Sequence, residues 1–287
     1  YGNSSGGVIS ITTEDPGAQP QADVALTAGS NGVRREALKV GAAQGPLQWL
    51  FSTSHFSTEG SRDHSAAERN SFNGKLRWQV AEGARLTLVL NSLRMPDAQD
   101  PLGLTRAELN ANPQQASPAA LLYNTRKSVS QDQIGLVWDQ RLGAADALQI
   151  TTYRGERAAV QFQAIPASAQ AAATHPGGVI DLSRSYQGLD VRWIRQDVLL
   201  ERPLTLTAGV ALDQLDEIRR GYQNFLGTGA AQVLGVQGAL RRDEVNQVRN
   251  LDPYAQLDWA FSDSWRLMAG LRQSSVKFQS TDHYIMP

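Results

Sequence analysis

The sequence predicts an all-β fold, a transmembrane antiparallel β-barrel, on three observations. Apolar and polar residues alternate with period two over long segments, which is the pattern of strands with one apolar and one wet face. Short and long connections also alternate along the chain, as in outer-membrane barrels with short periplasmic turns and long extracellular loops. The chain has 287 residues and a mean hydropathy of -0.35, and no apolar run approaches the about 20 residues that a membrane-spanning helix needs.

Period-two alternation is clearest in four segments. Leu204, Leu206, Ala208, Val210 and Leu212 interleave with Thr205, Thr207, Gly209, Ala211 and Asp213, and Trp265, Leu267, Ala269 and Leu271 interleave with Arg266, Met268, Gly270 and Arg272. The same alternation places Ile134, Leu136 and Trp138 on one face, and Phe72, Leu76, Trp78 and Val80 on another. About 11 strands are expected from such patterns, near residues 22–30, 33–44, 47–59, 67–81, 84–95, 126–141, 146–163, 183–201, 203–219, 246–262 and 264–281.

The connections between these strands divide into tight turns and long loops. Tight turns are expected at Gly45-Pro46, Glu82-Gly83, Gly143-Ala144, Arg202-Pro203 and Ser262-Asp263. The alternate connections, at 60–66, 96–125, 164–182 and 220–245, are mostly long. Asn31-Gly32 is the short member of this second set, and Asn-Gly is the strongest two-residue hairpin signal. Strands of about 12 to 18 residues disfavour a soluble sandwich, whose strands usually have about 5 or 6.

Tryptophan positions support a membrane barrel. Each of five lies within a few residues of a tight turn, namely Trp49, Trp78, Trp138, Trp259 and Trp265, and Trp193 is the exception. Tryptophan collects at membrane interfaces, where its apolar ring and polar N–H are both satisfied. The alternative is a soluble sandwich in which these tryptophans are core residues.

The opening sixteen residues carry a family resemblance. They contain Tyr1-Gly2, a small polar run, Gly6-Gly7, an apolar strand of Val8, Ile9 and Ile11, and then Asp15-Pro16. This resembles the end of the plug domain of TonB-dependent outer-membrane receptors. The resemblance implies that residues 1–19 are the C-terminal end of a plug, that residues 20–287 are the N-terminal half of a truncated barrel, and that residue 1 is not a true N-terminus. About 11 strands would be half of a 22-stranded plugged transporter.

Several loop segments resemble one subgroup of this family, the enterobacterial receptors linked to uptake of pyrroloquinoline quinone. They are Asp100-Pro101-Leu102-Gly103-Leu104-Thr105, Tyr123-Asn124-Thr125-Arg126-Lys127, Phe162-Gln163-Ala164-Ile165-Pro166, Gly177-Gly178-Val179-Ile180-Asp181-Leu182, Gly221-Tyr222-Gln223-Asn224-Phe225, Gln237-Gly238-Ala239-Leu240-Arg241-Arg242 and Asp252-Pro253-Tyr254.

The resemblance implies a transport function. The expected location is the outer membrane of a Gram-negative bacterium, in contact with lipid and lipopolysaccharide. Ligand would dock from outside, and the TonB-ExbB-ExbD machinery would pull on the plug to release it. Pyrroloquinoline quinone is the expected ligand and a ferric siderophore is the alternative. From another functional class, the barrel would be an adsorption surface for phage or bacteriocins, or a passive pore.

Other chemistry is not indicated. Gly2-Asn3-Ser4-Ser5-Gly6 matches the pattern of a hydrolase nucleophile elbow, but a strand follows where a helix is needed. His55, His64, His175 and His283 lack the spacing of a metal site. The 27 basic and 28 acidic residues are spread along the chain, which disfavours nucleic-acid binding. With no cysteine there is no thiol chemistry. We expect no enzyme activity, no cofactor and no metal site.

Two arginine pairs are the candidate ligand-binding residues. Arg219-Arg220 lie where the ninth expected strand leaves for its long loop, and Arg241-Arg242 lie where the chain returns. Guanidinium groups bind carboxylates bidentately and stay charged at any working pH, so converging pairs would hold a polyanion such as the tricarboxylate quinone. The alternative is a charged strand end at the headgroup or lipopolysaccharide level.

Overall fold

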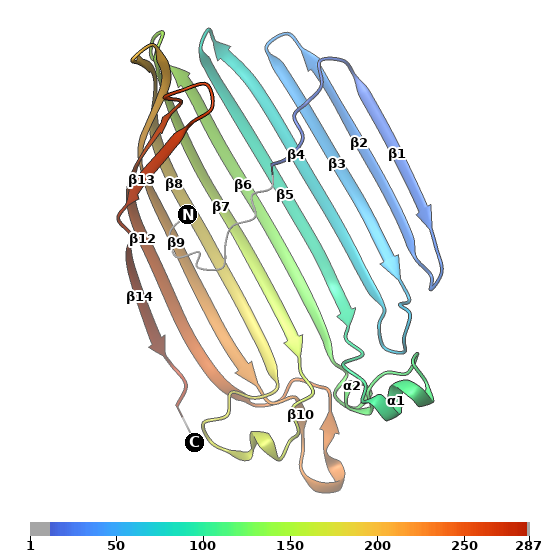
Figure 1. Cartoon of the computed structure of the whole chain (residues 1–287). Coiled ribbons are helices and arrows are strands. Elements are labelled where there is room, and N and C mark those ends of the chain that lie inside the picture. The colour runs from blue at the N-terminus through green and yellow to red at the C-terminus, as the bar shows by residue number, and fades with distance from the viewer. Residues whose placement is uncertain (1–11, 286–287) are drawn as a thin grey trace.

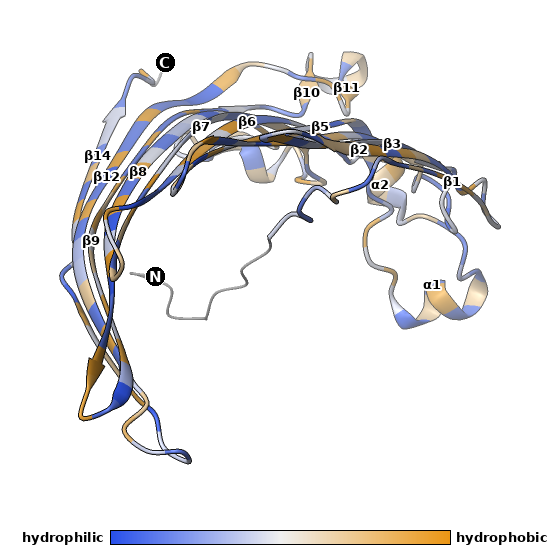
Figure 2. Cartoon of the chain, turned by 90° about the horizontal axis from the view of Figure 1, so that it is seen from above, coloured by the Kyte–Doolittle hydropathy of each residue, from blue (hydrophilic) through white to orange (hydrophobic). Residues whose placement is uncertain are grey.

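The computed structural model describes residues 12–285, which form one large, strongly curved antiparallel sheet (Figures 1 and 2). Neighbouring strands follow one another in the order β1-β2-β3-β4-β5-β6-β7-β8-β9-β12-β13, and β14 also pairs with β12. A separate two-stranded hairpin, β10-β11, lies in a loop. Apart from that insertion and the β12–β14 pair, all pairings are between sequence neighbours, which matches the up-and-down order of a barrel wall.

The strands are long. In chain order they are β1 Gln21–Ala28, β2 Arg34–Gln44, β3 Leu47–Thr58, β4 Ala67–Ala81, β5 Ala84–Gln99, β6 Arg126–Arg141, β7 Asp146–Phe162, β8 Val179–Leu199, β9 Arg202–Tyr222, β10 Phe225–Leu226, β11 Val233–Leu234, β12 Leu240–Trp259, β13 Leu267–Arg272 and β14 Ser275–Asp282. Two α-helices, α1 Arg106–Ala111 and α2 Pro118–Tyr123, and two 3-10 turns, Ala169–Ala171 and Gly229–Ala231, lie in the long loops. None of the helices among residues 12–285 is long and apolar enough to cross a membrane.

All eleven expected strands are present, and the last one is interrupted. β13 and β14 share one continuous register on β12 and are separated opposite Pro253. The carbonyl of Pro253 accepts from Gln273 N at 3.0 Å, but proline has no N–H to return the bond. The ladder is therefore interrupted over Gln273 and Ser274.

Several strand boundaries differ from the sequence prediction, since β5 continues to Gln99 and β8 begins already at Val179. The tight turn expected at Arg202-Pro203 lies instead at Leu200 and Glu201, which have φ of 53° and 61°. The strands flanking the loop at 223–239 extend farther than predicted, to Tyr222 on β9 and from Leu240 on β12. The loop-side ends of these two strands carry polar side chains on both faces. The sequence therefore loses its period-two alternation there, although the backbone pairing continues.

The Asn31-Gly32 hairpin is confirmed. Both residues have positive φ, 58° and 66°, as a type I′ turn requires. Val33 N donates to Ser30 O at 3.3 Å and closes the turn, and Gly29 N donates to Val33 O at 2.9 Å. Asparagine and glycine tolerate this left-handed backbone better than other residues.

The N-terminal segment identifies the two faces of the sheet. Residues 12–20 run along its concave side (Figure 2), where Asp15 contacts Lys75 and Arg77. Side chains alternate between faces along a strand, and paired residues share a face. These contacts therefore assign every paired residue to a side. We call the concave side the lumen face and the convex side the outer face.

The outer face is apolar across the middle of the sheet. One cross-strand row consists of Leu136, Thr152, Leu189, Leu212 and Leu251. Its leucines are 37% to 47% exposed. The lumen face carries polar side chains instead, and Glu217, Asn246 and Asp252 are buried there. Apolar side chains point outward and polar ones inward, which is the arrangement of a wall embedded in lipid.

Three lumen-face tyrosines each lie over a glycine on the neighbouring strand. The register pairs are Tyr153 with Gly188, Tyr186 with Gly155, and Tyr254 with Gly209. The three hydroxyls donate to the next strand along, to Asp213, Gln133 and Asp190 respectively. Each tyrosine therefore connects three strands, and each glycine supplies the space that the ring needs.

The tryptophans collect at the short-turn end more uniformly than the sequence indicated. Trp193, the expected exception, donates its indole N–H to Asp146 Oδ1 at 2.9 Å. Asp146 is the first residue of β7 after the tight turn, so Trp193 lies beside a neighbouring hairpin's turn. The pairing of β7 with β8 brings Trp193 and Asp146 together, and the sequence alone does not give the register of that pairing.

Candidate functional site

The four long connections pack against each other at one end of the sheet (Figure 1). We call residues 59–66, 100–125, 163–178 and 223–239 the loop cluster. All of its loops follow the ends of long strands, and the opposite end of the sheet carries the tight turns. Long loops of outer-membrane barrels are extracellular, so the loop cluster lies at the end of the sheet that corresponds to those loops.

Arg62 and His64 join the first two loops. The Arg62 guanidinium donates to the carbonyls of Leu102 at 2.7 Å, Gln115 at 3.0 Å and Pro101 at 3.2 Å. His64 Nε2 donates to the carbonyl of Thr125 at 2.8 Å. A guanidinium that spans three carbonyls satisfies loop backbone that has no ladder partner. These two side chains therefore hold the loops together.

A buried amide pair joins the third and fourth loops. Gln170 and Asn224 are both 0% exposed, and Gln170 Nε2 donates to Asn224 Oδ1 at 2.6 Å. Asn224 Nδ2 donates in turn to the carbonyls of Gln163 at 2.8 Å and Ile165 at 3.0 Å. Buried amides stabilise a structure when all their partners are present. This pair is therefore central to the contact between the third and fourth loops.

Gly235 and Arg126 join the two halves of the cluster. Gly235 N donates to Asn224 O at 2.8 Å, and an added Cβ at Gly235 would lie 3.0 Å from Tyr123 and Asn124. The Arg126 guanidinium lies 3.7 Å from the ring centroid of Phe162. The segments that carried the subgroup resemblance thus supply many of the contacts between loops. Their first role in the structure is to shape the cluster.

The predicted arginine pairs do not converge as pairs. Consecutive residues on a strand point to opposite faces, so Arg219 faces the lumen and Arg220 faces outward. Arg220 Nε lies 3.2 Å from Asp243 Oδ1 on the outer face. Arg242 Nε lies 3.0 Å from Glu244 Oε1, and Arg241 Nη2 donates to the carbonyl of Ala172 in the loop cluster. The ligand-binding role of the four residues stays a prediction. Among residues 12–285, Arg220 and Arg242 have ion-pair partners, whereas Arg219 and Arg241 have none.

A different guanidinium pair does converge. Arg157 on β7 and Arg184 on β8 are direct cross-strand partners on the lumen face. Arg184 pairs with Glu217, which also accepts from Asn246 Nδ2 at 3.2 Å, whereas Arg157 donates to the neutral amide oxygen of Gln131 at 2.9 Å. This cluster has one carboxylate for two guanidinium groups, so it attracts a further anion.

Sequence reasoning missed this pair because Arg157 and Arg184 are far apart in the chain. They become neighbours through the register across the loop at 163–178. A long loop leaves the register of its two strands undetermined. One sequence signal could have placed Arg157. The period-two alternation around Tyr153 puts Arg157 on the polar face of its strand.

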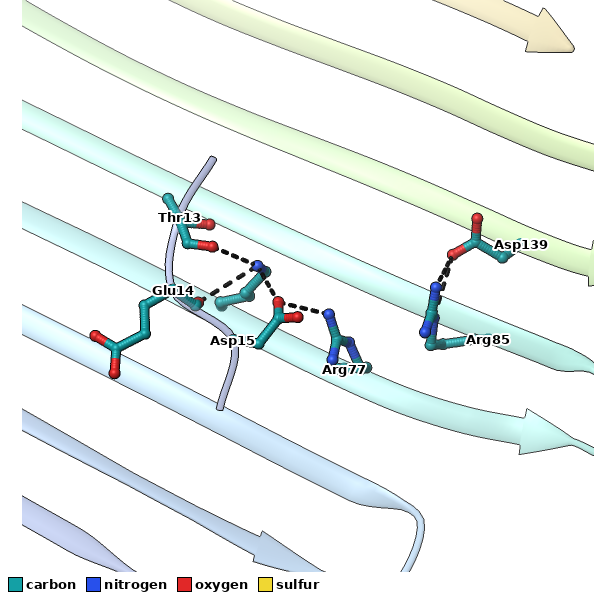
Figure 3. A network of polar contacts seen from close by, with 7 residues as sticks. Thr13, Glu14, Asp15, Arg77, Arg85 and Asp139 are labelled. Atoms are coloured by element: carbon teal, nitrogen blue, oxygen red, sulfur yellow. Dashed lines mark hydrogen bonds and ion pairs between the residues drawn. The ribbon is translucent and has the colours of Figure 1, made fainter. Parts of the chain in front are cut away.

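The N-terminal segment is held to the lumen face by charge (Figure 3). Asp15 Oδ1 lies 2.6 Å from both Lys75 Nζ and Arg77 Nη2. Hydrogen bonds from Arg77 and then Lys75 lower the pKa of the Asp15 carboxyl to about 2. Lys75 Nζ also donates to the carbonyl of Thr13 at 3.0 Å. The segment is therefore tied to β4 by charge, and Pro16 beside Asp15 is buried.

The comparison with known proteins identifies the family. Residues 77–286 match the family described as TonB dependent receptor-like, beta-barrel. The chain belongs to this family. The transmembrane barrel architecture predicted from the sequence is thus confirmed for the described part of the chain. The TonB-dependent receptors are receptors and transporters rather than enzymes.

Solved structures of low identity share the fold of this TonB-dependent receptor chain. The ferric citrate transporter FecA in its unliganded form has a TM-score of 0.70 at 16% identity, covering 91% of this chain and 37% of its own. The pyoverdine receptor FpvA from Pseudomonas aeruginosa, bound to pyoverdine, has a TM-score of 0.75 at 13% identity, covering 95% and 43%. BauA, the ferric preacinetobactin receptor from Acinetobacter baumannii, has a TM-score of 0.73 at 12% identity, covering 94% and 43%. The chain spans less than half the length of these proteins.

Across residues 12–285, no three His, Asp or Glu side chains come together in a way that would hold a metal ion. The motif at residues 2–6 lies outside the described residues. What the lumen face offers chemically is anion binding by guanidinium groups.

Proposed function

We propose that this protein is a receptor of the Gram-negative outer membrane that takes up a small, scarce, anionic ligand with energy supplied through TonB-ExbB-ExbD. Residues 1–19 form the end of its plug and residues 20–287 the first half of its barrel. Pyrroloquinoline quinone is the preferred ligand and a ferric siderophore the alternative. Outer-membrane lipid and lipopolysaccharide surround the barrel.

The observation that carries this proposal is the guanidinium pair on the lumen face. Arg157 lies five residues before β7 ends at Phe162 and gives way to the loop cluster, so a ligand passing the loops meets this pair inside the wall. Arg219 is one row closer to the loops on the same face. A ligand with several carboxylates would bind bidentately to such groups. Ferric complexes that carry net negative charge are attracted by the same field.

The N-terminal segment supports the energised mechanism. It lies against the lumen face through ion pairs in which the Asp15 side chain is 58% exposed and the Lys75 and Arg77 side chains are 12% and 21% exposed. Ion pairs of this kind are individually weak, so a segment held by them is released at low cost when it is pulled. A segment bound through a buried apolar face would resist being pulled off the sheet.

Calorimetric titration of the full-length protein in detergent tests the proposal. We expect pyrroloquinoline quinone to bind and the Arg157→Gln, Arg184→Gln double variant to bind at least about tenfold more weakly, the loss expected for a charge-assisted hydrogen bond. Arg195→Gln, which changes an outward guanidinium at the short-turn end, is the matched control. Tight binding of a ferric siderophore with no quinone binding would overturn the ligand assignment. A protein that binds neither, in a folded state, would overturn the receptor proposal.

A further inference from the structure

A basic row borders the apolar belt of the outer face. One step toward the loops from the leucine row, the register aligns Arg154, Gln187, Gln214, Arg249 and Lys277 across β7, β8, β9, β12 and β14. All five side chains are on the outer face. Charged residues on the lipid-facing side of a barrel are tolerated near the interface but not at the midplane. The row therefore marks the polar boundary of the membrane on the loop side.

A shallow groove of about 630 Å³ crosses this boundary. Its apolar side is formed by Ile134, Leu136, Leu189 and Leu212, and its polar side by Arg154, Gln187, Gln214 and Arg249. The two arginines are three strand spacings apart, about 14 Å at the backbone. The groove thus presents apolar surface next to two separated guanidinium groups with neutral amides between them.

The cations of this groove are free to bind an anion. Arg154 and Arg249 are exposed, and neither has an ion-pair partner among the residues that the structure describes. The next row toward the loops on the outer face is acidic, and most of its carboxylates already have hydrogen-bond or ion-pair partners. Asp132 pairs with Arg94 at 2.5 Å, and Asp216 accepts from Gln214 at 2.7 Å and Gln247 at 2.9 Å. Glu156, also in that row, is the remaining carboxylate.

We propose that this groove is a binding site for a phosphorylated glycolipid of the outer leaflet, with Arg154 and Arg249 on its phosphates and the leucines against its acyl chains. The inference rests on the outer-membrane location in the proposed function but not on the ligand carried. Arginine binds phosphate bidentately, and the apolar belt already requires acyl chains beside it. Two arginines separated along the row suit a headgroup that carries two phosphates, and the amides between them suit its sugar hydroxyls.

The test is lipid retention by the full-length protein, measured by native mass spectrometry after exposure to lipid A in mild detergent. We expect bound lipid A on the wild type and at least about tenfold less on the Arg154→Gln, Arg249→Gln double variant. Arg195→Gln is the control, because Arg195 is also on the outer face but at the short-turn end, where it pairs with Asp146 and Asp197. Heat-modifiable gel mobility verifies that each variant is folded.

Three outcomes would overturn the proposal. They are equal lipid A retention by the wild type and the double variant, an equal loss in Arg195→Gln, and displacement of the lipid by millimolar inorganic phosphate, which would indicate a site for free anions. Titration of the same samples with pyrroloquinoline quinone or a ferric siderophore reports separately on the proposed function. A failure of either proposal therefore leaves the other interpretable.

Discussion

Arg219 and Arg220 are consecutive on β9 yet serve opposite faces of the sheet. Arg220 is paired with Asp243 on the outer face, whereas Arg219 faces the lumen opposite Leu182 and Glu244. Because the side-chain period of a strand is two, adjacency in sequence separates two side chains instead of joining them. The two arginines therefore have separable roles.

The first prediction concerns this separation. Arg219→Ala should weaken binding of an anionic ligand about tenfold, because it removes a lumen guanidinium. Arg220→Ala should leave binding within about twofold, because its charge is on the other side of the wall. Calorimetry on both variants makes the comparison. Equal losses would show that the ligand contacts the strand ends from outside the barrel.

The sequence predicted the architecture well, for a physical reason. Period-two alternation arises within each strand, and turn chemistry such as Asn31-Gly32 is local, so both can be recognised without tertiary information. The break between β13 and β14 is different. Pro253 interrupts a ladder on the neighbouring strand, and the register that places Gln273 opposite it is a long-range property.

The candidate site was less predictable for the same reason. Arg157 and Arg184 come together through a register set across a long loop. Gln170 and Asn224, in different loops, form a buried pair only after both loops fold. No local pattern marks a buried amide, because the same residues are common in solvated loops. Sequence reasoning found the charges that are adjacent in the chain, and the structure shows those that are adjacent in space.

The second prediction concerns the tyrosine-glycine pairs. An added Cβ at Gly188 would lie 2.5 Å from ring atoms of Tyr153, so Gly188→Ala should destabilise the barrel by about 1 to 3 kcal/mol, the usual cost of overpacking. Gly143→Ala is the control, since nothing lies within 4 Å of a Cβ there. Urea unfolding of the full-length protein in micelles measures the difference. A neutral Gly188→Ala would mean that the ring moves away freely.

The third prediction concerns the loop cluster. Asn224→Ala removes the donor to Gln163 and Ile165 and takes away the side-chain acceptor of Gln170, whose Nε2 keeps its bond to the Ile165 carbonyl at 2.8 Å. Unsatisfied buried groups cost about 1 to 3 kcal/mol each, so residues 163–178 should become sensitive to protease and exchange their amide hydrogens faster. Gln237→Ala changes an exposed residue of the same loop and should have no effect. Unchanged protection in Asn224→Ala would show that the apolar contacts hold the loops without the amide pair.

The fourth prediction concerns pH and the N-terminal segment. The hydrogen bonds from Arg77 and Lys75 lower the pKa of Asp15 from 3.8 to about 2, so its carboxylate favours the docked segment at every pH above about 4 and loses this effect as pH falls through about 2. The chain has no cysteine, so Ala18→Cys gives a unique site for a nitroxide label three residues from Asp15. The label's mobility, read by electron paramagnetic resonance, should stay constant from pH 7 to 4. In an added Asp15→Asn background, the segment should be more mobile throughout this range. A mobility rise between pH 7 and 5 in the parent would assign the docking to a group other than Asp15.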